Sequence, residues 1–543
     1  MKHFYLSKQR ILFKNNIIGK GLLTGLFMVS LMGIFSFRNP KTVLPQPPVV
    51  AVNFQHLTSH QAMMDYLSTL TRHSKTVSMK IIGKSVQGRE IPALFFTADK
   101  KFASHRHTKP LVLIYCQQHG NEPSGKEAAL LAARDLLTKD KKLLDHFDLI
   151  LVPQVNPDGS EMLQRRNAHN MDLNRNHVVL SEPESQALHQ LFLTWKPEIT
   201  LDIHEYNCIK KAWIHHGYIK AADEMLGGVT NLNIDPSLIG FTRKVFVPET
   251  GKAIREKGFT FHRYTVGMPF QGYVLRHSTT AINDGRQSMG IYNTLSFIIE
   301  GRRFADPRQN IRHRVLGQEA AILSFLQTVA AHSPEMLTLV RKAREKLLKA
   351  EEPYDQVSRL QMDYFPDSAH KTCAFPVFDL YHWKTVTKNL ENYEPLVLVK
   401  TSVRKPVAYL YDASQKRLTA LLQKHHILLY ALNKEDTLQA QFYRIRHVTN
   451  DREEEKPHKY VDVAMWSQKK IFPKGSIVVL TAQPASNLIP LLLEPQSSYG
   501  IVTKAAMHQY VFSDYLKTGQ TYPIVRIVAP VTKEDLVKLN AEH

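Results

Sequence analysis

From residue 52 onward, apolar runs of strand length alternate with longer segments of helical periodicity. The apolar runs occur at 79–86, 91–97, 111–116, 147–155, 199–203, 211–214 and 294–300. The helical segments between them occur at 59–73, 124–137, 182–195 and 236–257. This alternation favours an α/β domain with a mixed, mostly parallel sheet flanked by helices. In such sheets, functional residues lie beyond the carboxyl ends of the strands.

Residues with metal-binding side chains lie at the ends of three of these apolar runs. His119 and Glu122 follow the run at 111–116. His204 and Glu300 lie at the ends of two later runs. Two imidazoles, one of them distant in the chain, and one carboxylate are a usual ligand set of a hydrolytic zinc site, whose fourth position is left to water. A separate carboxylate near that water would supply the base.

The length of the chain predicts more than one domain. Its 543 residues are too many for one ordinary domain. We expect a catalytic domain at 52–335, a helical and irregular linker at 336–395, and a smaller C-terminal α+β domain at 396–543. Short β-like runs in this last part occur at 403–410, 426–432, 441–448, 459–463 and 476–480. It contains no recognisable catalytic constellation, so we expect it to assist the first domain.

Residues 1–50 are predicted to form a signal peptide or membrane anchor followed by a proline-rich tether. Residues 1–20 contain five Lys or Arg and no acidic residue, and 21–37 are uncharged and mostly apolar. A basic segment before an apolar one is typical of export. The 17 apolar residues are long for a signal sequence and adequate for a spanning helix, so cleavage and retention both stay open. We expect an exported protein of the periplasm or cell envelope, either secreted or anchored.

The chain is strongly basic. Its formal net charge is +21, and residues 1–41 contribute +7, so the remainder carries 21 − 7 = +14. A basic excess favours anionic surfaces, such as a lipid membrane or the cell envelope. The sequence contains no zinc finger, no RNP-like aromatic pattern and no basic helix with heptads. We therefore expect no nucleic-acid partner.

Further motifs extend the pattern that begins at His119. In chain order they are HxxE at 119–122, NPDG at 156–159, Arg165, DLNRN at 172–176, and the strand ends at His204 and Glu300. NPDG alone predicts only a turn. Together and in this order, the motifs resemble the M14 family of zinc carboxypeptidases over about residues 60–330.

The resemblance implies a metal site and a base. It implies one Zn²⁺ per chain, bound by His119, Glu122 and His204. It also implies that Arg165 polarises the scissile carbonyl and that Glu300 is the general base. Zinc lowers the pKa of its bound water toward about 7, which makes hydroxide available near neutral pH.

The same resemblance implies how a substrate binds. Asn174 and Arg175 match the pair that holds the terminal carboxylate of the substrate. Arginine suits this role because its guanidinium donates two parallel hydrogen bonds. The mobile tyrosine that caps substrates in this family has no clear counterpart, and the candidates are Tyr273 and Tyr292.

The expected side-chain pocket contains two opposite charges. It lies about fifteen residues before Glu300, where the sequence has Asp284 and Arg286. Asp284 would favour basic side chains and Arg286 acidic ones, and the sequence leaves open which of them points inward. Glu205 also follows His204 where glycine is common in the family, which predicts an altered rim of the site.

The C-terminal half is similar to one bacterial branch of these enzymes. The similarity rests on PVAYL at 406–410, TAQP at 481–484 and LEPQS at 493–497. It implies no catalytic role for these segments.

We predict a zinc metallopeptidase, a carboxypeptidase that acts on peptides or cell-wall peptide stems. An amidase or deacylase on the same scaffold is the alternative, although Asn174 and Arg175 argue against it. A non-catalytic envelope binding protein is a third class. It predicts lost metal ligands, whereas all three are present in the sequence.

Overall fold

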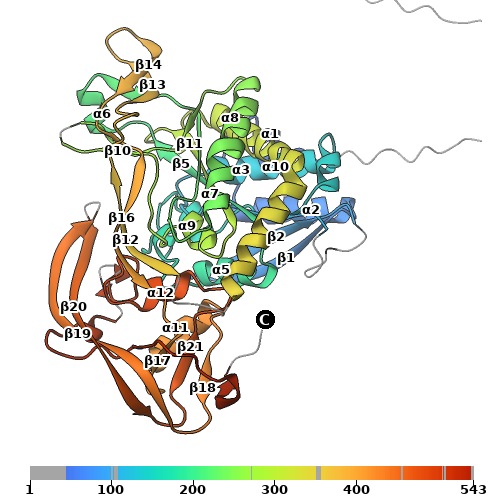
Figure 1. Ribbon diagram of the computed structural model, residues 1–543. Coiled ribbons are helices and arrows are strands. Elements are labelled where there is room, and N and C mark those ends of the chain that lie inside the picture. The colour runs from blue at the N-terminus through green and yellow to red at the C-terminus, as the bar shows by residue number, and fades with distance from the viewer. Residues whose placement is uncertain are drawn as a thin grey trace, which may run out of the picture. The chain divides into compact units, whose positions relative to one another are not determined.

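An eight-stranded sheet, in the order β1-β2-β4-β3-β5-β11-β7-β8, forms the centre of the first part of the chain (Figure 1). Its strands are β1 (Val77–Lys84), β2 (Glu90–Phe96), β3 (Leu111–Cys116), β4 (Asp148–Val152), β5 (Ile199–Asn207), β7 (Glu224–Gly228), β8 (Phe261–Arg263) and β11 (Leu295–Arg303). The pairs β4–β3, β3–β5, β5–β11 and β7–β8 are parallel, and the other three are antiparallel. The predicted α/β fold with a mixed, mostly parallel sheet is confirmed.

The computed structural model describes residues 44–99, 102, 108–270, 272–349, 356–453, 456–503, 505–506, 509–510 and 512–539. Most of the predicted signal or anchor segment lies outside these residues. Of its last residues, Pro48–Ala51 form the short helix α1. Within the described part of the chain, no helix is both long and apolar enough to cross a membrane.

Helices cover the sheet. They include α2 (His60–His73), α3 (Ser124–Leu137), α5 (Pro183–Trp195), α7 (Pro236–Phe241), α8 (Val247–Glu256), α9 (Gly285–Gly290) and α10 (Ile311–Leu348), with a π-helical turn at Thr242–Phe246. Helix α10 packs on α3, α8 and β11, and Figure 1 shows these elements together. Helix α9 contacts β5 and β11, and α5 contacts β1. Helix α2 begins after Ser59, whose hydroxyl accepts a hydrogen bond from the N–H of Ala62.

The predicted strand at 211–214 is wrong, because Lys211–His215 form the short helix α6. Trp213 is buried there, while its neighbours are half-buried or exposed. Periodicity cannot separate helix from strand in so short an apolar run.

The segment predicted as helical and irregular contains strands. Beyond α10, its strands are β12 (Val357–Phe365), β13 (Cys373–Asp379), β14 (Lys384–Leu390) and β15 (Tyr393–Glu394). Strand β13 pairs with β6 (Tyr218–Lys220), and β15 pairs with β10 (Leu275–Arg276). Strand β12 pairs with β16 (Leu396–Arg404), and β13 forms a hairpin with β14. The irregular part of the prediction was wrong because polar residues interrupt most of these strands and leave no continuous apolar run in them, as in Lys384–Leu390, which is mostly exposed. The domain boundaries stay predictions.

A seven-stranded sheet, in the order β20-β19-β24-β17-β21-β18-β25, forms the C-terminal part. Its strands are β17 (Ala408–Tyr411), β18 (Tyr430–Leu432), β19 (Asp436–Glu453), β20 (Lys456–Phe472), β21 (Ile477–Leu480), β24 (Val525–Ile527) and β25 (Leu536–Lys538). The helices α11 (Lys416–Lys424) and α12 (Leu488–Leu493) accompany it, so the predicted α+β character is confirmed. The run predicted at 403–410 is divided between β16 (Leu396–Arg404) and β17, because Pro406 has no N–H for a ladder.

One hydrophobic core extends through both parts. It includes Leu113 and Ile203 of the central sheet and also Leu418 and Tyr499 of the C-terminal part. The C-terminal part therefore packs against the first part through buried apolar side chains.

Candidate metal and catalytic site

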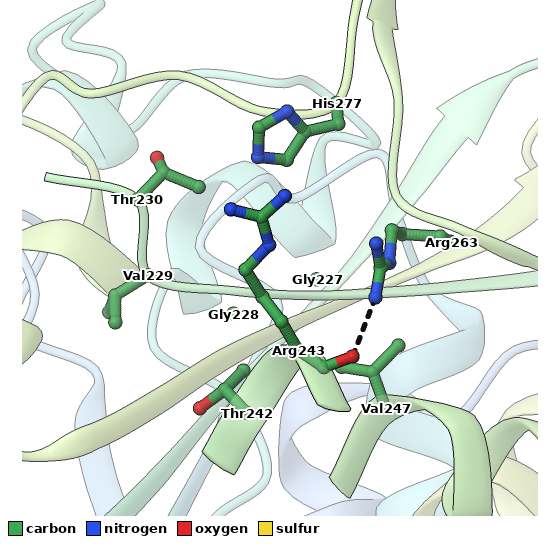
Figure 2. A pocket seen from close by; sticks show the side chains of 9 residues that line it. All are labelled: Gly227, Gly228, Val229, Thr230, Thr242, Arg243, Val247, Arg263 and His277. Carbon is green, nitrogen blue, oxygen red and sulfur yellow. Dashed lines mark hydrogen bonds between the residues drawn. The ribbon is translucent and has the colours of Figure 1, made fainter. Parts of the chain in front are cut away.

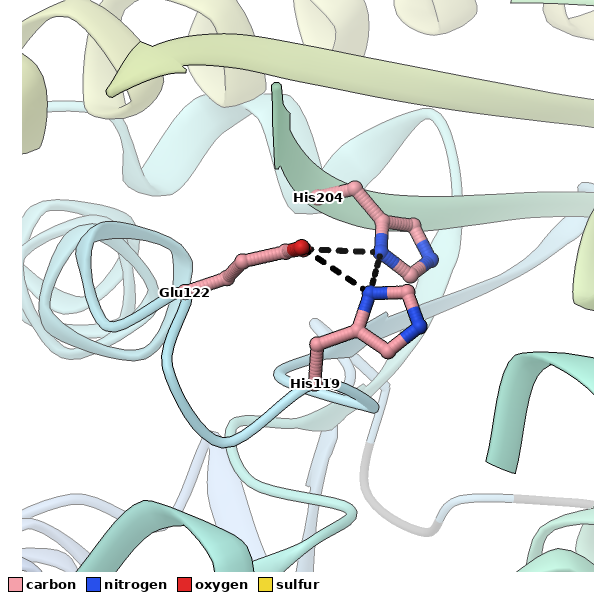
Figure 3. Close-up of side chains that lie close together, drawn as sticks. All are labelled: His119, Glu122 and His204. Atoms are coloured by element: carbon pink, nitrogen blue, oxygen red, sulfur yellow. Dashed lines mark hydrogen bonds and ion pairs between the residues drawn. The ribbon is translucent and has the colours of Figure 1, made fainter. Parts of the chain in front are cut away.

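Three predicted ligands converge at the carboxyl ends of β3 and β5 (Figure 3). Glu122 Oε1 lies 3.0 Å from His119 Nδ1, and Glu122 Oε2 lies 3.0 Å from His204 Nδ1. The two Nδ1 atoms are 3.1 Å apart. All three residues are buried.

Local backbone structure positions the first two ligands. Gln117, directly after β3, has a positive φ of 58°, which turns the chain toward the site. At Gly120 a Cβ would lie 2.0 Å from the carbonyl carbon of Gly159. Only glycine lets the turn that holds His119 approach the NPDG turn so closely.

Each ligand histidine has its own aspartate. Nε2 of His119 lies 3.0 Å from Oδ1 of Asp172, and Nε2 of His204 lies 2.9 Å from Oδ1 of Asp202. Carboxylates that accept the second N–H of a histidine fix its tautomer and its ring plane. Asp172 was missed as an orienting residue, although it begins the DLNRN motif.

The donor set fits a zinc ion. A neutral imidazole that donates its Nε2–H to an aspartate presents a bare lone pair at Nδ1. Two such lone pairs and the two oxygens of the Glu122 carboxylate therefore face one another at 3.0–3.1 Å, an arrangement that a cation stabilises. Donors bound to Zn²⁺ at about 2.0–2.2 Å in tetrahedral geometry are about 3.3 Å apart. The observed spacing is close to that value.

Glu300 lies beside the cluster. In the parallel pair β11–β5 it is directly opposite His204. Burial raises the pKa of Glu300 to about 7, and the charge of Glu122 adds to this, against the opposing effects of His204, His119 and Arg165. A carboxyl group poised near neutrality is suited to accept and return a proton.

Arg165 spans two acidic groups of the site. Its Nε donates to Asp172 at 3.1 Å, and NH1 donates to Glu122 at 3.3 Å. Burial opposes its charge, but Asp172 and Glu122 outweigh this effect and raise the pKa of Arg165. Part of its side chain stays exposed, so a substrate can reach the guanidinium.

Asn174 links the metal ligands to α9. Its Oδ1 accepts a 2.7 Å hydrogen bond from the N–H of Gly285, so Nδ2 is its donor group. Nδ2 lies 3.2 Å from Nε2 of His204. The next residue, Arg175, donates to the backbone oxygen of Asn174 at 2.6 Å. The structure thus places the predicted carboxylate-binding pair beside the metal cluster.

The structure separates the roles of Asp284 and Arg286. Asp284 caps α9, because its Oδ1 accepts from the N–H of Gln287 at 2.7 Å, and its Oδ2 pairs with NH2 of Arg286 at 3.2 Å. Arg286 is buried and lies over the ring of Tyr264. Its Nε and NH1 have no hydrogen-bond partner. Both oxygens of Asp284 therefore accept hydrogen bonds, whereas Nε and NH1 of Arg286 are available to donate to a ligand.

Tyr264 was not predicted as a site residue. It is buried, and its phenol pKa is raised by burial and by the charge of Glu300, while the charges of Arg286 and Arg175 lower it. The guanidinium of Arg286 lies 5.2 Å from the centre of the Tyr264 ring. Gly227 accommodates it, because a Cβ there would lie 2.6 Å from Cβ of Tyr264. No motif in the sequence marks this tyrosine.

Three further predicted residues have different surroundings. Tyr273 is exposed, and its N–H donates to the backbone of Phe270 in a turn. Tyr292 packs in the core against Phe192, so it cannot cap a substrate. The prediction that Glu205 alters the rim of the site is wrong, because this side chain is buried in an ion pair with Arg314.

Basic side chains line a pocket, shown in Figure 2. It is lined by Gly227, Gly228, Val229, Thr230, Thr242, Arg243, Val247, Arg263 and His277, none of which is acidic. Burial, followed by the charges of Arg243, Arg263 and Arg286, lowers the pKa of His277 to about 3. Thr230 joins the pocket to α9, because its hydroxyl accepts a 2.8 Å hydrogen bond from Gln287.

Comparison with known protein families gives the same assignment as the geometry. Residues 63–209 match the family model of the M14 peptidases, described as zinc carboxypeptidase. Over this range the chain is similar to the M14 zinc carboxypeptidases. The matched range contains His119, Glu122 and His204, and it ends before Glu300.

Curated proteins named as carboxypeptidases align with the chain to different extents. Carboxypeptidase 2 of Trichophyton tonsurans is 26% identical over 488 residues, which cover 87% of this chain and 86% of the fungal protein. Probable carboxypeptidase 2 of Arthroderma benhamiae is 30% identical over 265 residues, which cover 48% and 50%. A metallo-carboxypeptidase structure from Burkholderia cenocepacia has 19% identity and a TM-score of 0.39, and covers 50% of this chain and 69% of that one. The similarity to zinc carboxypeptidases, together with the His119, Glu122 and His204 cluster, supports zinc as the cofactor and a peptide as the substrate.

Proposed function

We propose that this M14 enzyme removes single residues from the free carboxyl end of peptides, with one Zn²⁺ held by His119, Glu122 and His204. The observation that supports this most is the 3.2 Å distance from Asn174 Nδ2 to His204 Nε2. A carboxylate-binding pair so near the metal restricts productive binding to the last peptide bond of a chain.

Glu300 and Arg165 act on the reacting groups. When bound, Zn²⁺ would lower the pKa of a water ligand toward about 7 and polarise the scissile carbonyl. Glu300 takes a proton from water and delivers it to the leaving nitrogen. Arg165, held by Asp172 and Glu122, donates to the oxygen on which negative charge develops.

Asn174 and Arg175 hold the terminal carboxylate. The amide of Asn174 is oriented by Gly285, so its N–H group faces the site. Arg175 supplies a permanent positive charge with a planar, two-pronged donor geometry. An amidated peptide end has no charge to pair with this group, which disfavours an amidase or deacylase function.

We further propose that the preferred terminal side chain is acidic. Both oxygens of Asp284 already accept hydrogen bonds, one from NH2 of Arg286 and the other from the N–H of Gln287, so Asp284 is not available to a substrate. The two unpartnered nitrogens of Arg286 and the basic pocket around His277 give this region a positive potential. A carboxylate side chain would complete the hydrogen bonds that Arg286 lacks.

We also propose that the enzyme acts outside the cytoplasm, on peptides or cell-wall peptide stems of the envelope. The support is the basic and apolar composition of residues 1–41 and the remaining charge of +14. Contact with an anionic membrane or envelope surface is part of this proposal. Tyr273, which is exposed, stays a candidate for closing over a bound substrate.

The proposal is tested with matched peptides that differ only at the C-terminus, one a free acid and the other an amide. We expect the zinc-loaded enzyme to shorten the free acid by one residue and to leave the amide intact in mass spectra. Equal cleavage of both would favour an amidase or endopeptidase and would overturn the carboxypeptidase assignment.

A further inference from the structure

A line of buried hydrogen bonds leads away from the metal ligand His204. Asp202, which accepts from Nε2 of His204, also accepts from the side-chain amide of Gln118. Nε2 of Gln118 lies 3.0 Å and 2.9 Å from the two oxygens of Asp202. Gln118 comes directly before the ligand His119 in the chain, but its side chain contacts Asp202, the partner of His204.

Two histidines continue the line. Oε1 of Gln118 lies 2.9 Å from Nε2 of His177, and Nδ1 of His177 lies 2.9 Å from Nε2 of His189. Asp202, Gln118, His177 and His189 are each at most 1% exposed. Solvent therefore does not compete for these hydrogen bonds.

The direction of every bond follows from chemistry. An amide oxygen facing a carboxylate would be repelled, so Gln118 donates to Asp202 and presents Oε1 to His177. His177 then carries its hydrogen on Nε2. Burial lowers the pKa of His177 to about 4, so the ring is neutral near pH 7 and Nδ1 accepts. His189 consequently donates from Nε2.

The far end of the line reaches the C-terminal part of the chain. His189 packs against His425, with ring centroids 5.8 Å apart. Nε2 of His425 donates to the carbonyl of Val178 at 2.9 Å. Nδ1 of His189 and Nδ1 of His425 have no hydrogen-bond partner. Gln118, His177 and His189 thus each donate in the direction of Asp202. No described partner of His189 favours the reverse direction.

The space around Asp202 is closed. A Cβ at Gly285 would lie 2.7 Å from Oδ2 of Asp202 and 2.8 Å from Nε2 of Gln118. The backbone of Gly285 is itself bonded to Asn174. Asp202 therefore has one orientation, defined by Gln118 on one side and His204 on the other.

We propose that His177 and His189 are positioning residues for the zinc ligand His204, acting through Gln118 and Asp202. The inference rests on the zinc site of the proposed function. Because each donor is directed at Asp202, the line keeps that carboxylate an acceptor and holds the ring of His204 with Nδ1 toward the metal. If His177 only filled space, His177→Gln would be impaired as much as His177→Leu, because glutamine restores the hydrogen-bond donor but not the ring.

The test compares His177→Leu with His177→Gln. Leucine removes the donor to Gln118, whereas glutamine places an amide N–H near the position of Nε2. His262→Leu is the control, because this partly buried histidine contacts the backbone carbonyls of Arg263 and Ala374 and the thiol of Cys373, none of which belongs to the line. The zinc dissociation constant is measured by chelator competition, and the Co²⁺-substituted absorption spectrum reports ligand geometry.

We expect His177→Leu to weaken zinc binding roughly tenfold and to shift the Co²⁺ bands, since partners that orient metal ligands contribute about 10–100-fold. His177→Gln should restore both, and His262→Leu should change neither. If His177→Leu does not fold, His189→Leu takes its place, because it removes the next donor. Wild-type zinc affinity and spectrum in a folded leucine variant would overturn the proposal, as would a glutamine variant as impaired as leucine.

The zinc measurements do not depend on whether the enzyme is a carboxypeptidase. A wild-type protein that binds zinc but cleaves no peptide would contradict the carboxypeptidase proposal, while the zinc measurements would still decide the role of His177. A wild-type protein that binds no zinc would contradict both.

Discussion

Glu300 on β11 lies directly opposite His204 on the parallel strand β5. The candidate base and a candidate metal ligand are therefore held by one ladder of backbone hydrogen bonds. Their separation cannot change without disruption of the central sheet. His119 and Arg165 lie on loops beside this fixed pair. Both side chains contact Asp172, which holds them in position.

Replacement of Glu300 by glutamine should abolish most activity while the metal stays bound. Glutamine keeps the size of the side chain but cannot accept a proton from water. We expect kcat to fall by roughly 10²–10⁴-fold, as for loss of a general base. Steady-state kinetics with zinc analysis of the same samples checks this, and an active Glu300→Gln protein would exclude Glu300 as the base.

The pH dependence of kcat/KM should show an acid limb from Glu300. Burial and Glu122 raise the pKa of Glu300 to about 7, and the charge of a bound Zn²⁺ lowers it from there. Only the ionised carboxylate accepts a proton, so kcat/KM should rise with pH through this pKa and then level off. A profile without any decline below neutrality would contradict this assignment.

Replacement of Arg175 by alanine should affect free-acid peptides alone. The loss of a charged hydrogen-bond pair corresponds to roughly 10–100-fold in kcat/KM. Arg175→Lys should recover little, because lysine cannot donate two parallel hydrogen bonds. The zinc content and thermal stability of the variant are the reference. If Arg175→Ala also lost zinc or stability, Arg175 would have a general structural role.

Arg286→Leu should remove the preference for acidic terminal residues. Peptides ending in Glu should lose roughly tenfold or more in kcat/KM relative to peptides ending in Leu, because the buried guanidinium is their counter-charge. Arg72→Leu, on the exposed end of α2, is the matched control. An unchanged ratio of Glu to Leu rates would show that Arg286 does not contact the side chain.

The buried histidines should make folding sensitive to mild acid. Burial lowers the pKa of His177 and of His425 to about 4. The unfolded chain, with a histidine pKa near 6.5, takes up these protons first, so stability falls as pH decreases from about 6.5 to about 4. The loss is up to about 3 kcal/mol per histidine. Denaturant unfolding at several pH values should give a shallower dependence for His425→Gln, and an unchanged slope would contradict the prediction.

The central sheet could be predicted because buried parallel strands are continuous apolar runs. Leu111–Cys116 is fully buried, and its sequence contains no charged residue. The strands at 357–390 were missed because most of them are not continuous apolar runs, and Lys384–Leu390, for example, is mostly exposed and polar. The helix at Lys211–His215 was missed because five residues carry too little periodicity.

The proposed metal ligands could be predicted from motifs, but the residues that hydrogen-bond to their partners could not. His119 and His204 follow strands and belong to recognisable patterns. Gln118, His177 and His189 belong to none, and only the fold brings them into line. The choice between Asp284 and Arg286 likewise required the start of α9, because its cap occupies Asp284.

The most direct measurement is a mass-spectrometric time course of a peptide mixture digested by the zinc-loaded enzyme. The account predicts ladders that lose one C-terminal residue at a time, fastest for acidic ends, and that are absent with Glu300→Gln or after zinc removal. Internal fragments, or shortening of amidated and free-acid peptides at equal rates, would contradict it.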